Sequence, residues 1–351
     1  KRKPPLLTDY QVVIIGVDNA MIAEWIKTRE IVTTETGDVE TDAETLATQI
    51  GLLKAIKDYK LKRVISFHSR VKRAQDFAED IGAAAEIVGK RHLPRGTVHA
   101  DFVSGKMSTS DRADKLKRLK RTRPKEVSLL ANARCLSEGV DVPSLDGVAF
   151  IDPKNSHVDI IQAVGRAIRL SGKKTVGTIV LPVFIQDGGD AETRIEESNF
   201  QPVWWVLNAL KAHDKVLVDE LDAIRIDMGR RGSLAARSGS IPKVALDLPV
   251  TAGKSFADAL KTRLVAQTTT SWSEWYGRLL AFKEKQGHCN ILRSYKPDPA
   301  LARWVTKQRA RKKGEALSPD RCVQLEALGF IWDPIATAWE KMFSKLVAYK
   351  G

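Results

Sequence analysis

The sequence has few metal-binding or cross-linking side chains and no long apolar run. It contains three cysteines, Cys135, Cys289 and Cys322, and six histidines among 351 residues. The cysteine count is odd and no C-x-x-C pair occurs, so a disulfide framework is disfavoured. No histidine stands at metal-ligand spacing from a cysteine or carboxylate, so we expect no metal site. No apolar run could span a membrane, and the basic start KRKPPLL lacks the apolar core of a signal peptide. We therefore expect a cytoplasmic protein, nucleoid-associated if bacterial, with no membrane partner.

Two glycine-rich nucleotide-binding loops are also missing. There is no G-x-G-x-x-G turn, which argues against a dinucleotide or nucleotide-sugar enzyme. The P-loop pattern G-x-x-x-x-G-K-[ST] is approached once, at VTAGKS (250–255), but Leu248 occupies the position of its first glycine and Pro249 follows. Because this segment follows a linker rather than a predicted core strand, we interpret it as the start of a helix.

Positive charge is what the sequence has in excess. Lysine and arginine number 57 against 43 aspartates and glutamates, which gives a net charge of +14. A basic soluble protein favours nucleic acid as its partner, although a basic surface without such a partner has the same composition. The distribution of the charge along the chain must decide between the two.

Strand-like and helix-like segments alternate over the first half of the chain. Such alternation is typical of a parallel α/β sheet with helices on its faces. Ligands of these sheets bind at the carboxyl ends of strands, so a site is expected in the loops after residues 66, 133 and 152. The predicted strands span 11–17, 63–69, 96–102, 126–133, 147–152 and 176–185, and the predicted helices span 43–59, 70–81, 108–121 (strongly basic) and 156–172.

The alternation ends near residue 186, and a helical extension is predicted over 187–268. Apolar spacing predicts one long helix over 200–228 and another over 255–267. Between them, the Gly/Ser/Arg-rich stretch 229–243 has the composition of a flexible linker.

A small all-helical module is predicted over residues 269–335, with proline at helix starts and glycine after helix ends marking three short helices. Its opening segment, WSEWYGRLLAFK (272–283), is repeated as WEKMFSKLVAYK (339–350). We therefore expect a second copy to begin within 336–351. The tryptophans recur at helical spacing, so we expect them in the core rather than stacked on bases.

The second helix of this module, ALARWVTKQRARKKG, contains no acidic residue. Arg303, Lys307 and Arg311 share one face at i, i+4 and i+8, and Arg309 and Lys312 add to the charge. Like charges at this spacing destabilise an isolated helix, so a polyanionic partner explains them better than a solvated face does. We therefore expect these five residues to bind nucleic acid, through its phosphates.

The segment SHVDIIQAVGRAIRLSG (156–172) concentrates polar residues on one side of a predicted helix. Ser156 with Asp159 forms an N-terminal capping signature, and Gly172 marks the end. Gly165 leaves room for close approach of a ligand. The predicted sheet-facing stripe is Ile161, Val164 and Ile168, and the opposite, polar stripe is Gln162, Arg166 and Arg169. Two arginines so placed could clamp a γ-phosphate, or could pair with local carboxylates on an ordinary surface helix.

Three motifs in order resemble the second RecA-like domain of superfamily 2 helicases. QAVGRAIR resembles motif VI, SEGVDVP (137–143) resembles motif V, and VISFHSR (64–70) resembles motif IV. The module at 271–334, with its G-H-x-N, R-W-V-x-x-Q-R and L-G-F-x-W elements, resembles the helicase-associated domain. Ala163 and Ile168 replace the arginine and glycine of the Q-R-x-G-R-x-G-R form of motif VI, which implies a divergent branch.

The resemblance implies roles for individual residues. Arg166 and Arg169 match the arginines that reach the γ-phosphate of ATP from across a cleft, and Gln162 matches a contact to the phosphate or attacking water. Gly165 lies within the same nucleotide-contacting motif. In motif V, Gly139 and Asp141 match residues that touch the nucleotide and the nucleic-acid backbone. At the end of motif IV, Ser69 and Arg70 match positions near the nucleic-acid track.

The resemblance also implies an organisation for the chain. The fold expected is a RecA-like parallel sheet with flanking helices, followed by a helical region and a three-helix module. The expected divisions are the end of a first motor domain or a junction over 1–40, the second RecA-like domain over 41–186, the helical extension over 187–268, the helicase-associated domain over 269–335, and the start of a second repeat over 336–351.

The function implied is that of the C-terminal half of an ATP-dependent nucleic-acid helicase or translocase, with DNA favoured over RNA as the polymer. ATP and Mg²⁺ would bind to a first RecA-like domain in cis. No P-loop occurs in the sequence, and the string DELD (219–222), which fits D-E-x-[HD], lies within the helix predicted over 200–228 and not after a predicted core strand. We therefore expect this chain, a monomer, to bind neither cofactor and to be inactive alone. The alternative is a non-enzymatic nucleic-acid-binding protein whose α/β domain is a docking platform.

Overall fold

The computed structural model describes residues 8–23, 43–87, 96–133, 145–153, 156–167, 169, 176–232, 240–241 and 243–350. The chain divides into two compact units, which are described separately. The first, the α/β unit, comprises Lys1–Val218 and Ser240–Leu264, and the second, the helical unit, comprises Asp219–Gly239 and Val265–Gly351. No helix in these described ranges is long and apolar enough to cross a membrane.

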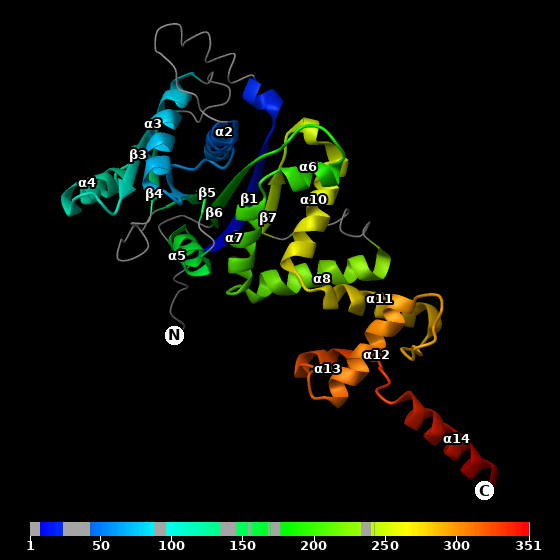
Figure 1. The fold of residues 1–351 in the computed structure, drawn as a ribbon. Coiled ribbons are helices and arrows are strands. Elements are labelled where there is room, and N and C mark those ends of the chain that lie inside the picture. The colour runs from blue at the N-terminus through cyan, green and yellow to red at the C-terminus, as the bar shows by residue number, and fades with distance from the viewer. Residues whose placement is uncertain are drawn as a thin grey trace. The chain divides into compact units, whose positions relative to one another are not determined.

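The α/β unit is built on a seven-stranded sheet whose order is β3-β4-β2-β5-β6-β1-β7 (Figure 1). Every pair of neighbouring strands is parallel. All carboxyl ends therefore lie at one edge of the sheet, as the sequence predicted. The strands are β1 (Asp9–Val17), β2 (Arg63–His68), β3 (Thr97–Ser104), β4 (Glu126–Ala133), β5 (Gly147–Asp152), β6 (Val176–Phe184) and β7 (Val244–Asp247).

Strand β1 is an interior strand of this sheet. It pairs with β6 along its whole length, and on its other side Val12–Ile15 pair with β7. This corrects the assignment of residues 1–40 to a first motor domain or a junction, because β1 lies within the sheet of the α/β unit. It also corrects the description of 187–268 as a helical extension with a flexible linker, since β7 within this range forms an edge of the sheet. A four-residue edge strand is too short to give a clear sequence pattern.

Helices cover both faces of the sheet, because residues alternate sides along each strand. Val13, Ile15 and Val17 share a buried cluster with residues of α2 and α3. On another part of the unit, α5 packs on β5 and β6 and also contacts α7. The helices are α2 (Ala43–Asp58), α3 (Val71–Ile87), α4 (Thr109–Lys120), α5 (His157–Ala167), α6 (Ala191–Glu197), α7 (Gln201–Lys211) and α10 (Gly253–Thr268), whose last residues belong to the helical unit.

The long helix predicted over 200–228 is two helices, α7 and α8 (Lys215–Arg231). Asp214 stands between them and caps α8 by accepting a hydrogen bond from the backbone N–H of Leu217 at 3.1 Å. Its carboxylate also accepts from the hydroxyl of Tyr10 at 2.7 Å and from Lys243 Nζ at 2.9 Å. Burial would raise the pKa of Asp214, but these hydrogen bonds outweigh burial and lower it to about 2. The apolar pattern runs on through this break, so periodicity alone does not reveal it.

The helical unit contains the expected three-helix module. Its helices are α11 (Ser271–Gln286), α12 (Pro299–Lys313) and α13 (Pro319–Ala327), followed by α14 (Pro334–Lys350). Asp298 caps α12 by accepting from the N–H of Leu301 at 3.0 Å. The core includes Trp272 and Trp304, with ring centroids 6.2 Å apart. Trp339 on α14, in the predicted start of the second repeat, is 66% exposed, so the expectation of a buried tryptophan is wrong at this position.

Helix α8 belongs largely to the helical unit and crosses α11 at two glycines. A Cβ atom on Gly229 would overlap the carbonyl oxygen of Glu274, and one on Gly277 would overlap that of Ile226. Arg225 forms an ion pair with Glu274 at 2.5 Å. The predicted linker therefore begins later than residue 229, because α8 continues to Arg231.

Candidate functional site

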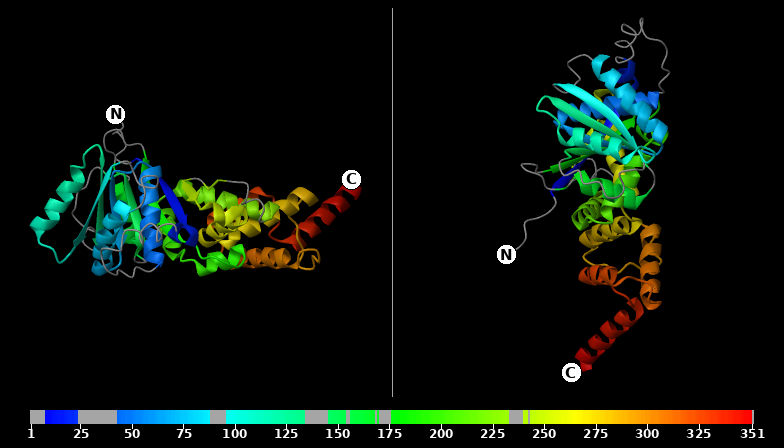
Figure 2. Two further views of the ribbon diagram at one scale, coloured as in Figure 1. Left: turned by 90° about the horizontal axis from the view of Figure 1, so that it is seen from above. Right: turned by 90° about the vertical axis from the view of Figure 1, so that its left-hand side faces the viewer.

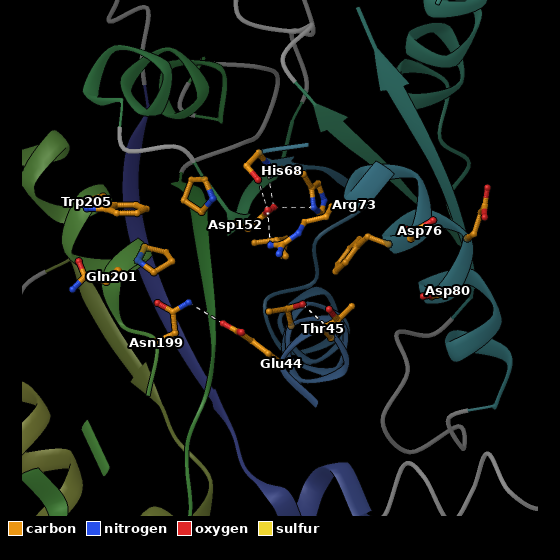
Figure 3. A pocket seen from close by; sticks show the side chains of 17 residues that line it. Glu44, Thr45, His68, Arg73, Asp76, Asp80, Asp152, Asn199, Gln201 and Trp205 are labelled. Atoms are coloured by element: carbon orange, nitrogen blue, oxygen red, sulfur yellow. Dashed lines mark hydrogen bonds and ion pairs between the residues drawn. The ribbon is translucent and has the colours of Figure 1, made fainter. Parts of the chain in front are cut away.

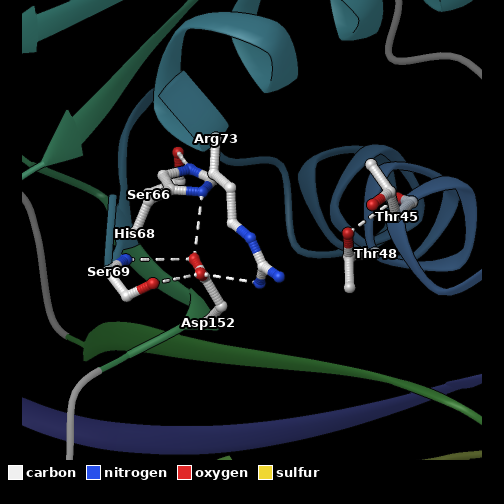
Figure 4. A network of polar contacts seen from close by, with 7 residues as sticks. All are labelled: Thr45, Thr48, Ser66, His68, Ser69, Arg73 and Asp152. Atoms are coloured by element: carbon white, nitrogen blue, oxygen red, sulfur yellow. Dashed lines mark hydrogen bonds and ion pairs between the residues drawn. The ribbon is translucent and has the colours of Figure 1, made fainter. Parts of the chain in front are cut away.

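The carboxyl ends of β2 and β5 lie side by side, and Asp152 joins them (Figure 4). One carboxylate oxygen, Oδ2, accepts from Ser69 Oγ at 2.6 Å and from Arg73 Nη1 at 3.0 Å. The other, Oδ1, accepts from the Ser69 backbone N–H at 3.1 Å and lies 3.4 Å from His68 Nδ1. The aspartate that ends β5 thus fixes the chain where it leaves β2.

This cluster has a definite charge state. Burial would raise the pKa of Asp152, but the hydrogen bonds from His68 and Ser69 outweigh burial and hold the pKa below its ordinary value. The His68 ring is buried, lies 3.0 Å from Ser66 Oγ through Nε2, and packs on Phe77 with centroids 4.8 Å apart. Asp152 is therefore an anion at neutral pH, and its partners hold it in one orientation.

A cavity of about 700 Å³ opens beside this cluster (Figure 3). It lies between the start of α2, the end of β2, α3, the end of β5 and the start of α7. Asn199 Nδ2 donates to Glu44 at 2.8 Å across part of its wall. Its lining includes Glu44, Thr45, His68, Arg73, Asp76, Phe77, Asp152, Gln201 and Trp205. The cavity lies at the sheet edge where parallel α/β folds bind ligands.

Sequence reasoning pointed to the loop after residue 152 but did not single out Asp152, His68 or Arg73. The available signal was that a charged residue directly ends an apolar strand. The partners of Asp152 lie more than 75 positions away in the sequence, and only the pairing of β2 with β5 brings them together.

The two motif IV residues have different surroundings. Ser69 is half-buried, and its hydroxyl donates to Asp152. Arg70 is exposed, immediately before α3. A polyanion could therefore meet the Arg70 side chain directly, whereas Ser69 is held in place by Asp152.

Helix α5 starts as predicted but turns a different side toward the sheet. The N–H of Asp159 donates to Ser156 Oγ at 3.3 Å, as the capping signature requires. Its buried residues are Ile160, Ala163, Val164, Arg166 and Ala167, while Ile161 is only half-buried and Ile168 lies outside the described residues. The predicted sheet-facing stripe is therefore correct at Val164 and wrong at Ile161, because the buried face is rotated to include Ile160 and Ala163.

The predicted polar stripe is split by this rotation. Gln162 and Arg169 are exposed, but Arg166 is only 8% exposed. The prediction that Arg166 lies on the polar stripe opposite the sheet is therefore wrong, because this side chain is largely enclosed by its own unit. At Gly165, an added Cβ would meet no atom within 4 Å, so the helix surface there is open to close approach. Gly139 and Asp141 lie outside the described residues.

The basic face of α12 is present in part. Arg303 and Lys307 are exposed, and Arg311 is half-buried. Lys312 lies 3.5 Å from Glu326 and 5.3 Å from the centre of the Trp332 ring. These four residues keep a cationic group at the surface.

Arg309 does not belong to that face, which corrects its assignment as a nucleic-acid contact. Its Nε donates to the carbonyl of Ile331 at 2.9 Å, and its Nη1 donates to the carbonyl of Ile291 at 2.8 Å. The guanidinium also lies 5.4 Å from the centre of the Phe330 ring, and burial lowers its pKa. Arg309 therefore holds two loops of the module together.

The segment VTAGKS follows a strand of the sheet, β7, and not a linker as the sequence suggested. Its loop contacts an acid, because Thr251 Oγ1 donates to the carboxylate of Asp18, which is 1% exposed. A buried carboxylate beside this loop opposes phosphate binding, and α10 begins at Gly253, so the interpretation as a helix start stands. Across the described ranges, no group of three or more His, Cys, Asp or Glu side chains could hold a metal ion.

Comparison with known families identifies both parts of the chain. Residues 47–171 match the helicase conserved C-terminal domain, and residues 269–333 match the helicase associated domain. The first match contains the Asp152 cluster and α5, and the second contains α11, α12 and α13.

Individual relatives agree with these matches. A protein named as a helicase in Sulfolobus islandicus filamentous virus is 31% identical over 88 residues, which are 25% of this chain and 15% of the relative. A protein named as a helicase in African swine fever virus is 42% identical over 59 residues, 17% of this chain and 7% of the relative. The chain thus spans a small part of the length of these relatives.

Among solved structures, the ATP-dependent Type ISP restriction-modification enzyme LlaBIII bound to DNA has a similar fold. The TM-score is 0.60 at 20% identity, over 93% of this chain and 24% of that enzyme. The similarity extends through both the α/β unit and the helical unit, and it concerns the fold.

Proposed function

We propose that this chain is one half of an ATP-driven nucleic-acid motor. It carries the C-terminal RecA-like domain of a superfamily 2 helicase followed by a helicase associated domain. The other half of the nucleotide site would lie on a P-loop domain in cis. The observation that carries this proposal is the surface of the motif VI segment: Gln162 is exposed on α5, the helix surface over Gly165 is open, and Arg169, two residues after α5 ends at Ala167, is exposed.

Arg166 near the end of α5 and Arg169 just after it would have different roles at the γ-phosphate. Phosphoryl transfer needs positioned positive charge around the transferring group, and the guanidinium fork matches phosphate oxygens. ATP, when bound between the domains, supplies the phosphoryl group whose transfer to water releases energy for movement. Arg169, which is exposed, would donate to the phosphate oxygens, and Gln162 would orient the attacking water.

Arg166 would act from a more enclosed position. At 8% exposure its guanidinium is held by the surrounding unit, so little side-chain entropy is lost when a phosphate approaches. The open surface over Gly165 would let the nucleotide or the opposite domain come close to the helix backbone. Magnesium would bind through residues of the P-loop domain, and the residues of this chain need no contact with it.

Nucleic acid would bind through the charged side chains of both units. In the helical unit the candidates are Arg303, Lys307, Arg311 and Lys312, which keep their cationic groups at the surface. In the α/β unit the charged candidate is Arg70, and the neutral hydroxyl of Ser69, oriented by Asp152, lies next to it. Contacts of this kind engage phosphates, so they support binding without sequence preference. We propose DNA rather than RNA as the polymer.

An ATPase experiment tests the proposal. The purified chain is expected to hydrolyse no ATP with or without DNA, because its sequence contains no P-loop. In the longer protein that joins it to a P-loop domain, Arg169→Ala is expected to lower kcat by about 10³-fold or more while ATP still binds. Arg231→Ala, at an exposed arginine of α8, is the matched control and should leave kcat unchanged.

Two results would count against the motor. DNA-stimulated ATP hydrolysis by this chain alone would show that the nucleotide site is elsewhere. An unchanged kcat in Arg169→Ala, with DNA binding intact, would favour a docking role for the α/β unit.

A further inference from the structure

Helix α4 and the turn after it carry an uninterrupted basic run that the proposed function does not use. Residues 115–125 read KLKRLKRTRPK, with seven lysines or arginines and no acid. The run covers the last two turns of α4 and continues to the start of β4 at Glu126. Its density of charge exceeds that of the α12 face.

Three of these cations are used inside the unit. Lys115 forms an ion pair with Asp101 and lies 5.3 Å from the centre of the Phe102 ring. Arg118 reaches the same aspartate at 3.4 Å, and Arg123 lies 3.5 Å from Glu126. One buried anchor, Leu119, fixes the helix to the sheet.

The other four cations have no such use. They are exposed, and no described residue forms an ion pair with any of their side chains: Lys117, Lys120, Arg121 and Lys125. Lys117, Lys120 and Arg121 lie at i, i+3 and i+4, so they share a face of the helix. Each therefore extends its charge into solvent beside two like charges.

Helix stability does not explain this arrangement. Cations in the last turn gain from the helix dipole, which accounts for part of the charge on α4. That effect falls off within one turn, so it does not account for Arg123 and Lys125 in the following turn. Like charges at i, i+3 and i+4 also repel, which costs helix stability. An external anion would remove that cost.

The basic run reaches the amino end of β4, whereas the candidate site lies at the carboxyl ends of β2 and β5. Helix α4 packs on β3 and β4 beside the edge strand β3, at the outer end of the sheet in both Figure 1 and Figure 2. It starts after the carboxyl end of β3 and returns to the amino end of β4. An eight-residue strand such as β4 is roughly 25 Å long, so the run is separate from the Asp152 cluster.

We propose that the C-terminal half of α4 and the turn through Lys125 form a second nucleic-acid surface, which binds the phosphate backbone through Lys117, Lys120, Arg121 and Lys125. Four exposed cations that form no ion pair with a described residue match a line of phosphates, and each contact releases counterions. A motor that binds nucleic acid at the carboxyl ends of the strands gains affinity from a second contact at their amino ends. Both contacts must break before the protein dissociates.

The proposal shares its ligand class with the proposed function, but it concerns a different surface. Three double variants with equal change in charge separate the two ideas. They are Lys117→Glu with Lys120→Glu on α4, Arg303→Glu with Lys307→Glu on α12, and the control Lys215→Glu with Lys254→Glu at exposed lysines of α8 and α10. The full chain is titrated into a labelled 20-base-pair DNA duplex at several salt concentrations.

The α4 pair is expected to weaken duplex binding about tenfold at low salt and to reduce the slope of log K against log[salt] by about 2. The control pair should change neither by more than about twofold. Unchanged affinity and slope in the α4 pair would overturn the second surface, even if the α12 pair loses binding. Equal losses in the α4 and control pairs would also overturn it, because net charge alone would then explain binding.

Anionic phospholipid vesicles provide a further comparison. Vesicle binding that is abolished by the α4 pair, with duplex binding intact, would overturn the choice of nucleic acid as the partner. Circular dichroism should show unchanged helix content in all three variants, because every substituted side chain is exposed.

Discussion

At the scale of single residues, two cationic side chains of the same helix have different roles: one forms hydrogen bonds within the module and the other faces solvent. Arg309 and Lys307 are two positions apart on α12, yet one faces inward and the other faces solvent. The guanidinium of Arg309 can donate to two carbonyls at once because its donors are fixed in a plane. A lysine could satisfy only one direction at a time.

Substituting these neighbours should separate stability from binding. Arg309→Ala is expected to lower the free energy of unfolding by about 2 kcal/mol, since the carbonyls of the buried Ile291 and the half-buried Ile331 lose their donor. Lys307→Ala should leave stability within about 0.5 kcal/mol and weaken DNA binding. Urea unfolding and duplex titration of both variants check this. A stable Arg309→Ala protein that binds DNA poorly would return Arg309 to the binding face.

At the scale of elements, a few polar residues decide where helices and strands meet. Asp152 ties the end of β5 to the start of α3, and Asp214 ties the α7–α8 turn to β1 and to the residue before β7. Both carboxyl groups have pKa values below the ordinary value because hydrogen bonds outweigh burial. Both contribute to stability only while they are ionised.

Asp214 gives this idea a pH test. Its pKa is about 2 in the folded chain, and an unfolded aspartate titrates near about 3.9. The lower folded value means that its contribution is fully present above about pH 4 and is lost as the pH falls through 2. Asp214→Asn should therefore unfold at lower urea than the wild type at pH 7, and the difference should shrink between pH 4 and pH 2. A difference that is independent of pH would mean that the charge is not involved.

At the scale of the whole molecule, the boundary between the two units falls inside helices. Asp219–Gly239 belong with the helicase associated domain and not with the α/β unit that precedes them in the chain. The crossing of α8 and α11 at Gly229 and Gly277 requires the absence of side chains at the contact. The helical unit is therefore larger than the residues 269–333 that match the domain family.

A pair of glycine substitutions tests this boundary. Gly277→Ala should destabilise the helical unit by about 1–3 kcal/mol, because a methyl group would overlap the backbone of α8. Gly165→Ala is the matched control for stability and should be neutral or slightly stabilising, since alanine favours a helix and the space there is open. Amide hydrogen exchange should quicken in α8 and α11 of Gly277→Ala, with the strands of the α/β unit unaffected. Equal exchange in both units would mean that they unfold together.

The sequence by itself determined the succession of strands and helices, the parallel class of the sheet and the two helicase domains. Apolar runs, caps and spaced motifs are local signals, and the predicted strands from β1 to β6 agree with the structure closely. The sequence also predicted that Gln162 and Arg166 lie on one helix, but that helix, α5, ends at Ala167 and so does not include Arg169.

Only the tertiary structure decided which side chains are available. The burial of Arg166, the inward turn of Arg309, the place of β1 inside the sheet and the role of Asp152 all depend on neighbours distant in sequence. Helical periodicity gives the spacing of the residues that form a buried stripe. It leaves the rotation of the helix about its own axis uncertain by about one residue, and packing against the sheet sets that rotation. The physical reason is that burial and hydrogen bonding are properties of contacts between segments, which local sequence patterns do not encode.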